Sequence, residues 1–185
     1  MPPSHWPNEI IYIETCSYHS SVSQAARTLL GSPKSNQSKG DPSCVAIRRI
    51  SESNHPACGQ FGLFATKKIK PNAHIVDYIG EIHCDEREES DYDLSLFRDG
   101  DLNVGIDAST MGNEGRFVND YRGIPGQDKP NAKFVEVRRP SGELGIRIES
   151  SRMIKKGEEI LVSYGKAWWQ ARKQVVQVEP ELEQK

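Results

Sequence analysis

Apolar and polar positions alternate over short stretches through most of the chain, and Gly, Pro or Asn separates one stretch from the next. Short runs of this kind, rich in β-branched and aromatic residues, are typical of β-strands. They predict strands at residues 10–13, 45–47, 61–65, 74–82, 134–138 and 145–149. The Pro-Ser-Gly sequence at residues 140–142 predicts a hairpin turn between the last two. Ile160, Val162 and Tyr164 are expected on one face of a final strand, so the pattern predicts a mainly β fold of the α+β class with a few short helices.

One short helix is predicted near the start of the chain. Ser21 and Gln24 have the spacing of a capping box, in which two side chains bond to backbone N–H groups at a helix N-terminus. Gly31 and Pro33 would end this helix. Its apolar side is expected to carry Val22, Ala25, Ala26, Leu29 and Leu30.

These features divide the chain into three parts. Residues 1–43 are an N-terminal extension with a polar linker at 32–43, residues 44–172 are the main domain, and residues 173–185 are the end of a C-terminal helix (166–178) with an acidic tail. We interpret the extension as a segment that packs on the domain; the alternative is an element that binds a partner. A chain of 185 residues is long enough for one domain with a sizeable core.

Charge and hydropathy exclude several classes of function. The chain carries 24 Lys and Arg and 26 Asp and Glu residues, a net charge of −2, so its totals give no indication of direct nucleic-acid binding. Apolar runs are shorter than the ~18 residues that a membrane span needs. There is no segment of signal-peptide type. We therefore expect a monomer in the cytoplasm or the nucleus, without a membrane partner.

The cysteines indicate free thiols. Cys16, Cys44, Cys58 and Cys84 form no C-x-x-C pair, which favours a reducing compartment. His55 lies close in sequence to two of them, but a fourth ligand at a recognisable spacing is missing, so no metal site is expected.

Two stretches carry more information than their periodicity. Residues 112–131 (GNEGRFVNDYRGIPGQDKPN) contain an apolar pair between Arg116 and Asn119 that is too short for a helix face, and they run into a Gly- and Pro-rich loop. Residues 157–165 (GEEILVSYG) follow later in the chain. Together they resemble the SET-domain lysine methyltransferases, whose signature is R-F-hydrophobic-N-H-S, then P-N, then G-E-E-L-x-x-x-Y-G.

Three further blocks extend the resemblance in the family's order. Residues 62–66 with Ile69 resemble its G-x-G-L-F-A segment, residues 78–81 its Y-x-G-E, and residues 106–113 its I-D-A-x-x-x-G-N. The resemblance implies the SET-domain fold, in which small sheets surround a knot-like C-terminal crossing and the last motif strand passes beside the asparagine motif. It also implies a protein-lysine N-methyltransferase that uses S-adenosylmethionine.

The resemblance assigns catalytic roles to two tyrosines. Tyr164 corresponds to the family's catalytic tyrosine, whose hydroxyl lies close to the methyl group and the amine, and Tyr78 to the tyrosine that lines the lysine channel. Without the resemblance, each would be interpreted as an ordinary aromatic residue of a sheet. Phe134 and Val162 are expected to bound the substrate's amine pocket together with Tyr78. Their side chains have no hydroxyl, so we expect room for more than one methyl group.

Cofactor binding is expected from other positions. By resemblance, Asn119 and the backbone of Asp120 hold S-adenosylmethionine, Arg116 ties down the loop and Phe117 fills the core beneath it. One of the tryptophans at residues 168–169 would stack on the adenine, or both would belong to the core. The positions expected to bind the cofactor, those in 60–64 through their main chain, are Gln60, Gly62, Leu63, Phe64, Arg116, Phe117, Asn119, Asp120, Tyr164 and Trp168.

The expected chemistry needs no acid/base pair. A lysine amine attacks a methyl group only when neutral, and its ordinary pKa of about 10.4 makes the neutral form cost roughly 4 to 5 kcal/mol at pH 7. An apolar channel and the positive sulfonium both disfavour the charged amine. Alignment of nitrogen, methyl carbon and sulfur then accounts for several kcal/mol of the barrier.

Several positions depart from the family pattern. Asp120-Tyr121 stands where the family has H-S, residues 122–129 are a longer insertion than usual, and Gln60 occupies the place of a glycine, with Gly59 one position early. An aspartate can replace the histidine if its charge is solvated or paired. No cysteine follows Cys84, so the zinc segment that many members carry near their end is absent.

Two functions therefore stay open. One is methylation of a lysine-containing protein, with a histone tail as the default substrate and another nuclear or ribosomal protein as the alternative. The other is an inactive SET-like module that binds a basic peptide or a protein partner. Residues 85–93 (DEREESDYD) carry six carboxylates and are expected either to border the peptide groove or to form a solvated loop or helix start.

Overall fold

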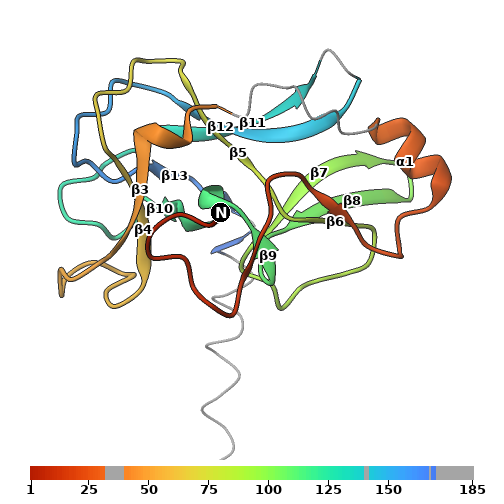
Figure 1. The fold of residues 1–185 in the computed structure, drawn as a ribbon, viewed down its shortest axis with the longest axis horizontal. Helices are drawn as coiled ribbons and strands as arrows, with labels where there is room; N and C mark the ends of the chain where they lie inside the picture. Colours follow the sequence, from red (N-terminus) through yellow and green to blue (C-terminus); the bar gives the residue numbers. More distant parts are fainter. Residues whose placement is uncertain (32–39, 140–141, 167, 170–185) are drawn as a thin grey trace, which may run out of the picture.

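Short strands make up most of the structure. The computed structural model describes residues 1–31, 40–139, 142–166, 168 and 169. The helix α1 (Gln24–Leu30) lies at one edge of the molecule, beside the strands (Figure 1). The prediction of a mainly β fold with few short helices is confirmed. Most of the predicted polar linker, the tip of the predicted hairpin turn and the greater part of the predicted C-terminal helix with its acidic tail lie outside the described residues.

One sheet contains three antiparallel strands. Its order is β11 (Ala132–Arg138), β12 (Leu144–Ser150) and β5 (His74–Tyr78). β11 and β12 form the predicted hairpin, in which Ala132 lies opposite Ser150 and Arg138 opposite Leu144. The middle strand β12 is buried along nearly its whole length. It therefore provides a fixed base for the loops that follow it.

A second sheet contains four strands, in the order β2 (Ser17–Tyr18), β6 (Glu81–His83), β8 (Leu102–Asp107) and β7 (Asp93–Asp99). The sequence analysis did not predict β7 or β8. It was also wrong to predict one strand over residues 74–82, which the structure divides into β5 and β6. A β-carbon on Gly80 would lie 2.4 Å from the carbonyl oxygen of Asp107, so the chain turns there against the backbone of a neighbouring strand.

A separate hairpin explains why Gly59 stands one position earlier than the family's glycine. β3 (Val45–Arg49) follows the short 3-10 turn Pro42–Cys44 and pairs antiparallel with β4 (Phe61–Ala65). The loop between the two strands closes through Ile50 N–H to the Gln60 carbonyl at 2.8 Å and Gly59 N–H to the Ile50 carbonyl at 2.9 Å. Gly59 has a φ of 84°, a backbone conformation that glycine adopts without strain. The glycine is therefore needed where it stands, to close this loop.

The predicted crossing of two distant segments is confirmed. β10 (Asn119–Asp120) pairs in parallel with β13 (Leu161–Val162), and Asn119 lies opposite Leu161. Asn131 fastens the crossing, because its side-chain oxygen accepts from Leu161 N–H at 2.8 Å and its amide nitrogen donates to the Glu159 carbonyl at 2.7 Å. β13 has only two residues, and Ile160, Leu161 and Val162 are all buried. The prediction of one buried face in alternation was therefore wrong for this strand, which is covered on both sides.

The N-terminal helix begins later than the capping box predicted. Ser23, not Ser21, caps α1, and its hydroxyl oxygen accepts from Ala26 N–H at 3.2 Å. Ser21 instead donates to Asp85 at 2.7 Å. Ala26 is buried, but the expected apolar positions Ala25 and Leu29 are exposed. A helix of seven residues has room for only a narrow buried stripe.

The described part of the extension packs on the rest of the chain. β1 (Ile11–Tyr12) pairs in parallel with β9 (Met111–Gly112), and β2 pairs in parallel with β6. Val22, Ala26 and Leu30 belong to the same buried cluster as the strands. The packing interpretation of this segment therefore fits residues 1–31.

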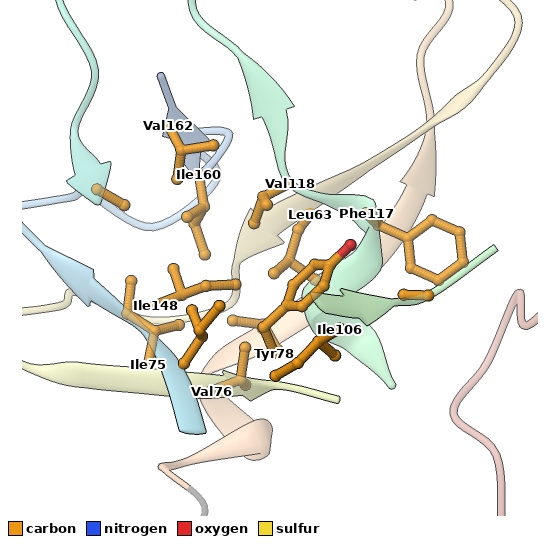
Figure 2. Close-up of a cluster of buried hydrophobic side chains, with 14 of the residues drawn as sticks. Leu63, Ile75, Val76, Tyr78, Ile106, Phe117, Val118, Ile148, Ile160 and Val162 are labelled. Atoms are coloured by element: carbon orange, nitrogen blue, oxygen red, sulfur yellow. The ribbon is translucent and has the colours of Figure 1, made fainter. Parts of the chain in front are cut away.

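The apolar cluster lies between the sheets and the crossing. Figure 2 shows side chains of β4, β5, β8, β12 and β13 converging on it, with Val118 from the asparagine motif. Leu63, Ile148 and Ile160 are completely buried. Burial contributes roughly 25 cal/mol for each Å² of apolar surface, so this cluster fixes the relative positions of the two crossing segments.

Candidate active site

A cavity of about 730 Å³ lies beside the crossing, within the volume range of small-molecule sites. Residues far apart in the sequence line it. They are Pro7, Glu9, Ile10, His55, Pro56, Ala57, Gly59, Gln60, Phe61, Asp91, Tyr92, Ser109, Arg116, Phe117, Asn119, Asp120, Arg122, Tyr164, Trp168 and Trp169. Seven of the predicted site residues are in this set: Gln60, Arg116, Phe117, Asn119, Asp120, Tyr164 and Trp168.

Tyr164 follows β13 and is held at both ends. Its hydroxyl donates to the Val118 carbonyl at 2.7 Å, and its main-chain N–H donates to Asp120 at 2.7 Å. Burial, together with the nearby Asp120 charge, raises the pKa of the phenol well above its ordinary value. The side chain is therefore a neutral hydroxyl at pH 7. Its ring meets the Trp168 ring edge-on at 4.8 Å between centroids.

The Asp120 carboxylate is paired rather than isolated. Oδ1 accepts from Arg122 N–H at 2.8 Å, and Oδ2 accepts from the Arg122 guanidinium at 2.7 Å as well as from Tyr164 N–H. The guanidinium also donates to Ser163 at 3.2 Å. The charge that the histidine-to-aspartate departure introduces is thus satisfied by an arginine from the longer loop.

Asn119 projects from β10 beside a buried carboxylate. Its amide nitrogen donates to Glu159 Oε1 at 2.8 Å and to the Phe61 carbonyl at 3.3 Å. Gly62 makes this contact possible, because a β-carbon there would lie 2.6 Å from the Glu159 oxygen and 3.2 Å from the Asn119 nitrogen. The glycine of this motif therefore leaves space for the Asn119 side chain, which lines the cavity, and for the Glu159 carboxylate that bonds to it.

The segment from Gln60 to Phe64 contributes unevenly to the cavity. Gln60 and Phe61 line it, whereas the Leu63 side chain is fully buried in the apolar cluster. The Phe64 ring lies under the Arg48 guanidinium at 5.5 Å. Neither Leu63 nor Phe64 is among the lining residues. The cavity therefore meets this segment at Gln60 and Phe61, and cofactor binding by the main chain of residues 62–64 stays a prediction.

Arg116 and Phe117, in the 3-10 turn Glu114–Phe117, support the cavity from below. The Arg116 guanidinium donates to the Ala108 carbonyl at 2.9 Å and lies 4.2 Å from the centre of the Tyr92 ring. Phe117 meets Phe61 edge-on at 6.1 Å. Both side chains thus tie down the loop as well as line the cavity.

The three residues predicted to bind the substrate, Tyr78, Phe134 and Val162, are not among the residues that line the cavity. Tyr78 is buried, its hydroxyl donates to the Tyr92 carbonyl at 2.6 Å, and its ring meets Phe134 edge-on at 5.6 Å. Burial raises the pKa of Tyr78. Val162 is fully buried. Tyr92, whose carbonyl accepts the bond from Tyr78, does line the cavity, and the substrate-binding roles of Tyr78, Phe134 and Val162 stay predictions.

The sequence analysis missed Tyr92, His55 and the N-terminal lining residues. Tyr92 lies within the acidic stretch of residues 85–93, where the density of charge obscured the single aromatic residue. The N-terminal segment reaches the cavity because Ile11 N–H donates to the Thr110 carbonyl at 3.0 Å and Trp6 meets Phe117 edge-on at 5.5 Å. The Trp6–Phe117 contact joins residues 111 positions apart, which no local pattern indicates.

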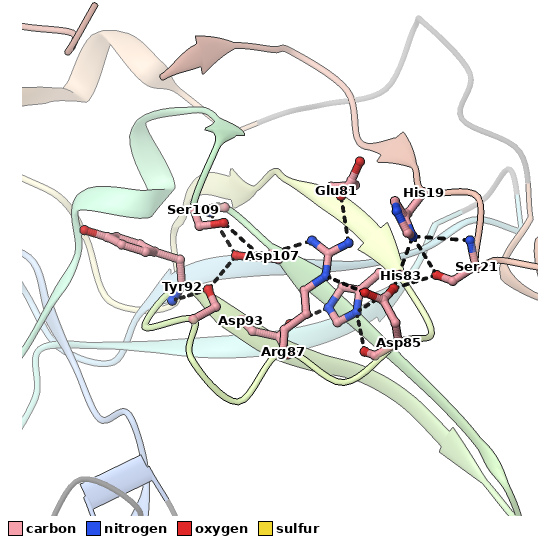
Figure 3. Close-up of polar contacts among 12 residues, drawn as sticks. His19, Ser21, Glu81, His83, Asp85, Arg87, Tyr92, Asp93, Asp107 and Ser109 are labelled. Carbon is pink, nitrogen blue, oxygen red and sulfur yellow. Dashed lines mark hydrogen bonds and ion pairs between the residues drawn. The ribbon is translucent and has the colours of Figure 1, made fainter. Parts of the chain in front are cut away.

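Residues of the acidic stretch take part in two groups of ion pairs. Arg87 bonds to Glu81 at 2.8 Å, Asp107 at 3.0 Å and Asp85 at 3.2 Å (Figure 3). Asp93 pairs with the buried His83 at 2.8 Å. Residues 84–92, which the structure describes throughout, contain no helix, so the expectation of a helix start was wrong. Its exposed carboxylates are Asp85, Glu86, Glu88, Glu89 and Asp91.

Two further expectations concern metals and membranes. Among the described residues, no three His, Cys, Asp or Glu side chains are grouped closely enough to hold a metal ion. Within the same residues, no helix has both the length and the apolar character for crossing a membrane.

Comparisons with known proteins match the region of the chain that contains the sequence motifs. The family model described as "SET domain" matches residues 60–165. The Caenorhabditis elegans "Histone-lysine N-methyltransferase set-2" is 38% identical over 114 residues, which cover 56% of this chain and 7% of that protein. The human "Histone-lysine N-methyltransferase EHMT1" is 31% identical over 117 residues, which cover 59% of this chain and 8% of that protein. The chain thus spans less than a tenth of the length of these two relatives.

Solved structures share the fold at low sequence identity. ATXR5 in complex with mono-methylated histone H3.1 has a TM-score of 0.61 at 17% identity, over 84% of this chain and 81% of that chain. The protein ctPRC2, in an autoinhibited conformation bound to S-adenosylmethionine, has a TM-score of 0.53 at 24% identity, over 72% of this chain and 16% of that chain.

Proposed function

This chain belongs to the SET-domain family, and on that premise we propose that it is a protein-lysine N-methyltransferase that transfers a methyl group from S-adenosylmethionine to a histone lysine. The observation that carries the proposal is that Asn119 and Tyr164, 45 positions apart in the sequence, line one cavity of small-molecule size. The printed names of the two relatives support the activity and the histone substrate.

The chemical groups that line the cavity suit S-adenosylmethionine, as its volume does. Both Asn119 amide hydrogens are taken by Glu159 and Phe61, so the amide oxygen is left as an acceptor for an ammonium or a hydroxyl. Phe61, Tyr164 and Trp168 provide aromatic surface for a flat heterocycle. When bound, S-adenosylmethionine supplies an electrophilic methyl group on a sulfonium.

Tyr164 supplies acceptors rather than a base. Its hydroxyl hydrogen is committed to the Val118 carbonyl, so the lone pairs of the phenol oxygen stay available to an amine N–H or to the polarised C–H bonds of a methyl group. Its raised pKa keeps the phenol neutral, so it does not stabilise a charged lysine. Tyr78 is buried and its ring meets the partly buried Phe134, and apolar surroundings of this kind favour the neutral amine.

A basic substrate suits the charges near the site. Glu86, Glu88 and Glu89 are exposed on the segment that leads to Tyr92. Exposed carboxylates raise the local concentration of a lysine- and arginine-rich peptide. By their resemblance to the family's amine-pocket positions, Phe134 and Val162 would place no hydroxyl at the amine, which supports transfer of more than one methyl group. A product that mass spectrometry finds only in the monomethyl form at long reaction times would refute that last point.

Incubation with labelled S-adenosylmethionine and mixed histones tests the proposal, with calorimetric titration of the cofactor alongside. We expect label on a histone and saturable cofactor binding. Cofactor binding without label on any histone would refute the histone substrate. If the chain binds no cofactor, the methyltransferase proposal fails, and an inactive module that binds a basic peptide becomes the better reading.

A further inference from the structure

A histidine from outside the matched region reaches the wall of the cavity. His55 lies in the loop between β3 and β4, before residue 60 where the family match begins, and only 7% of its side chain is exposed. Ala57 N–H donates to its Nδ1 at 3.0 Å, so this nitrogen carries no hydrogen. Nε2 therefore carries the ring hydrogen and donates to Glu159 Oε2 at 3.0 Å. The geometry fixes His55 as the neutral tautomer protonated on Nε2.

The same carboxylate determines how Asn119 is oriented. Glu159 accepts from His55 on one oxygen and from the Asn119 amide nitrogen on the other, at 2.8 Å. The second amide hydrogen goes to the Phe61 carbonyl. With both hydrogens committed, the amide cannot turn over, and its oxygen points away from the two acceptors. Loss of the Glu159 acceptor would free the amide to rotate.

Each of the three hydrogen bonds, from Ala57 to His55, from His55 to Glu159 and from Asn119 to Glu159, already contains its one hydrogen. An extra proton on His55 Nδ1 would face the Ala57 N–H, and an extra proton on Glu159 would remove the negative charge to which the His55 and Asn119 N–H groups donate. The first case sets two donors against each other and breaks a bond, and the second turns two charge-assisted hydrogen bonds into weaker ones. We propose that His55 is a positioning residue for the cofactor: it orients Asn119 through Glu159, and one added proton disrupts this orientation and weakens binding of S-adenosylmethionine.

The surroundings decide how easily that proton enters. Burial raises the pKa of Glu159 and outweighs the hydrogen bonds from Asn119 and His55 that lower it. The charge of Glu52, in the same loop as His55, also raises it. Tyr164 lies near enough that the Glu159 charge raises its own pKa, but the phenol stays neutral throughout. The Glu159 carboxylate therefore takes up a proton at a higher pH than an exposed carboxyl group does.

The inference rests on the proposed function, because its ligand is S-adenosylmethionine. The experiment is calorimetric titration of that cofactor into the full chain between pH 8 and pH 5.5, with His55→Gln, Glu159→Gln and His74→Gln in parallel. The cofactor's own groups titrate in the same way with every protein, so the informative quantity is the difference in the pH dependence of affinity between wild type and variant. His74→Gln is the matched control, since His74 pairs with Asp77 at 2.9 Å and is not among the cavity-lining residues.

We expect the wild-type affinity to fall as the pH decreases. His55→Gln keeps a donor toward Glu159 without an imidazole, so its decline should move to lower pH. In Glu159→Gln, an NH₂ group replaces one carboxylate oxygen and faces an N–H donor of His55 or Asn119. This variant should bind S-adenosylmethionine about tenfold more weakly already at pH 8, the effect of about one lost hydrogen bond. The control should follow the wild type.

Two results would overturn the inference, and one of them leaves the proposed function intact. If His55→Gln declines at the same pH as the wild type, His55 does not position the cofactor, although the chain still binds it. If the wild type binds no cofactor at pH 8, the proposed function fails and the inference fails with it. Nitrogen NMR of the ligand-free protein adds a test without any ligand: a hydrogen on Nδ1 of His55 at pH 8 would contradict the tautomer.

Discussion

The main-chain N–H of Tyr164 donates to Oδ2 of Asp120 at 2.7 Å, so the carboxylate of one crossing segment holds the backbone of the other. The same oxygen accepts from the Arg122 guanidinium at 2.7 Å. The aspartate that departs from the family pattern therefore connects the cavity-lining asparagine motif to the catalytic candidate. The longer loop supplies Arg122, and this arginine neutralises the charge that the aspartate introduces.

Asp120→Asn tests this connection. One of the two carboxylate oxygens becomes an NH₂ group that faces donors, so we expect the free energy of unfolding to decrease by about 1–3 kcal/mol. Urea unfolding measures it. Asp128→Asn, at an exposed position of the same loop, is the control and should change little. Equal stability of both variants would show that the Asp120 bonds contribute nothing net.

Tyr164→Phe separates catalysis from binding. The change removes the hydroxyl that bonds to Val118 but keeps the ring against Trp168. We expect methyl transfer to fall by about 10²-fold or more, the effect of losing one oriented polar group at a reacting centre. Calorimetry should find cofactor affinity nearly unchanged. Tyr121→Phe is the matched control, since that tyrosine is not a lining residue; equal turnover of the two variants contradicts the catalytic role.

Trp6→Ala tests whether the N-terminal segment belongs to the site. The Trp6 ring meets Tyr12 edge-on at 5.0 Å, and its indole N–H donates to the Ile10 carbonyl at 2.7 Å. Without these contacts, residues 7–10 lose their support on the cavity wall, and we expect cofactor affinity to fall by about tenfold. Ile11→Ala is the control, because that side chain is 59% exposed. The idea fails if both variants bind the cofactor as tightly as the wild type does.

The strands that the sequence could predict are those with a local signal. The hairpin of β11 and β12 followed from two alternating runs with a turn sequence between them. The two-residue pair β10 and β13 has no periodicity at all, and only the resemblance of its two motifs to a known family predicted that they meet. The helix cap shifted from Ser21 to Ser23 because Ser21 bonds to Asp85, 64 positions away.

Site residues that lie inside a sequence motif could be predicted. Those that reach the cavity only through tertiary contacts could not. Asn119 and Tyr164 stand inside motifs, and both line the cavity. His55 lies in a loop without a motif, and its tautomer depends on Ala57 and Glu159, which sequence spacing does not bring together. Tyr92 was masked by the charges around it. Arg87 could not be assigned from the sequence, because its three carboxylate partners come from three positions in the second sheet and the loop beside it.

Asp107 gives the fold a specific sensitivity to acid. Burial alone would raise its pKa, but hydrogen bonds from Ser90, Ser109 and Arg87 outweigh burial and lower the pKa below the ordinary 3.8. A carboxyl group with a lowered pKa stabilises the fold above its unfolded pKa and loses that contribution as the pH falls through its folded pKa. The stabilisation is therefore complete at pH 5 to 7, begins to decrease near pH 3.8 and is lost as the pH falls further, through the folded pKa.

Asp107→Asn removes this contribution. Urea unfolding should find the variant less stable than the wild type by about 1.5–3 kcal/mol at pH 7, the range for hydrogen bonds to a charged group. The difference should shrink as the pH is lowered toward 3, because the wild-type carboxyl group then becomes protonated. Asp101→Asn, at an exposed turn between β7 and β8, should match the wild type at every pH. A difference between Asp107→Asn and wild type that stays constant down to pH 3 would mean that shape, and not the carboxylate charge, holds the Arg87 cluster together.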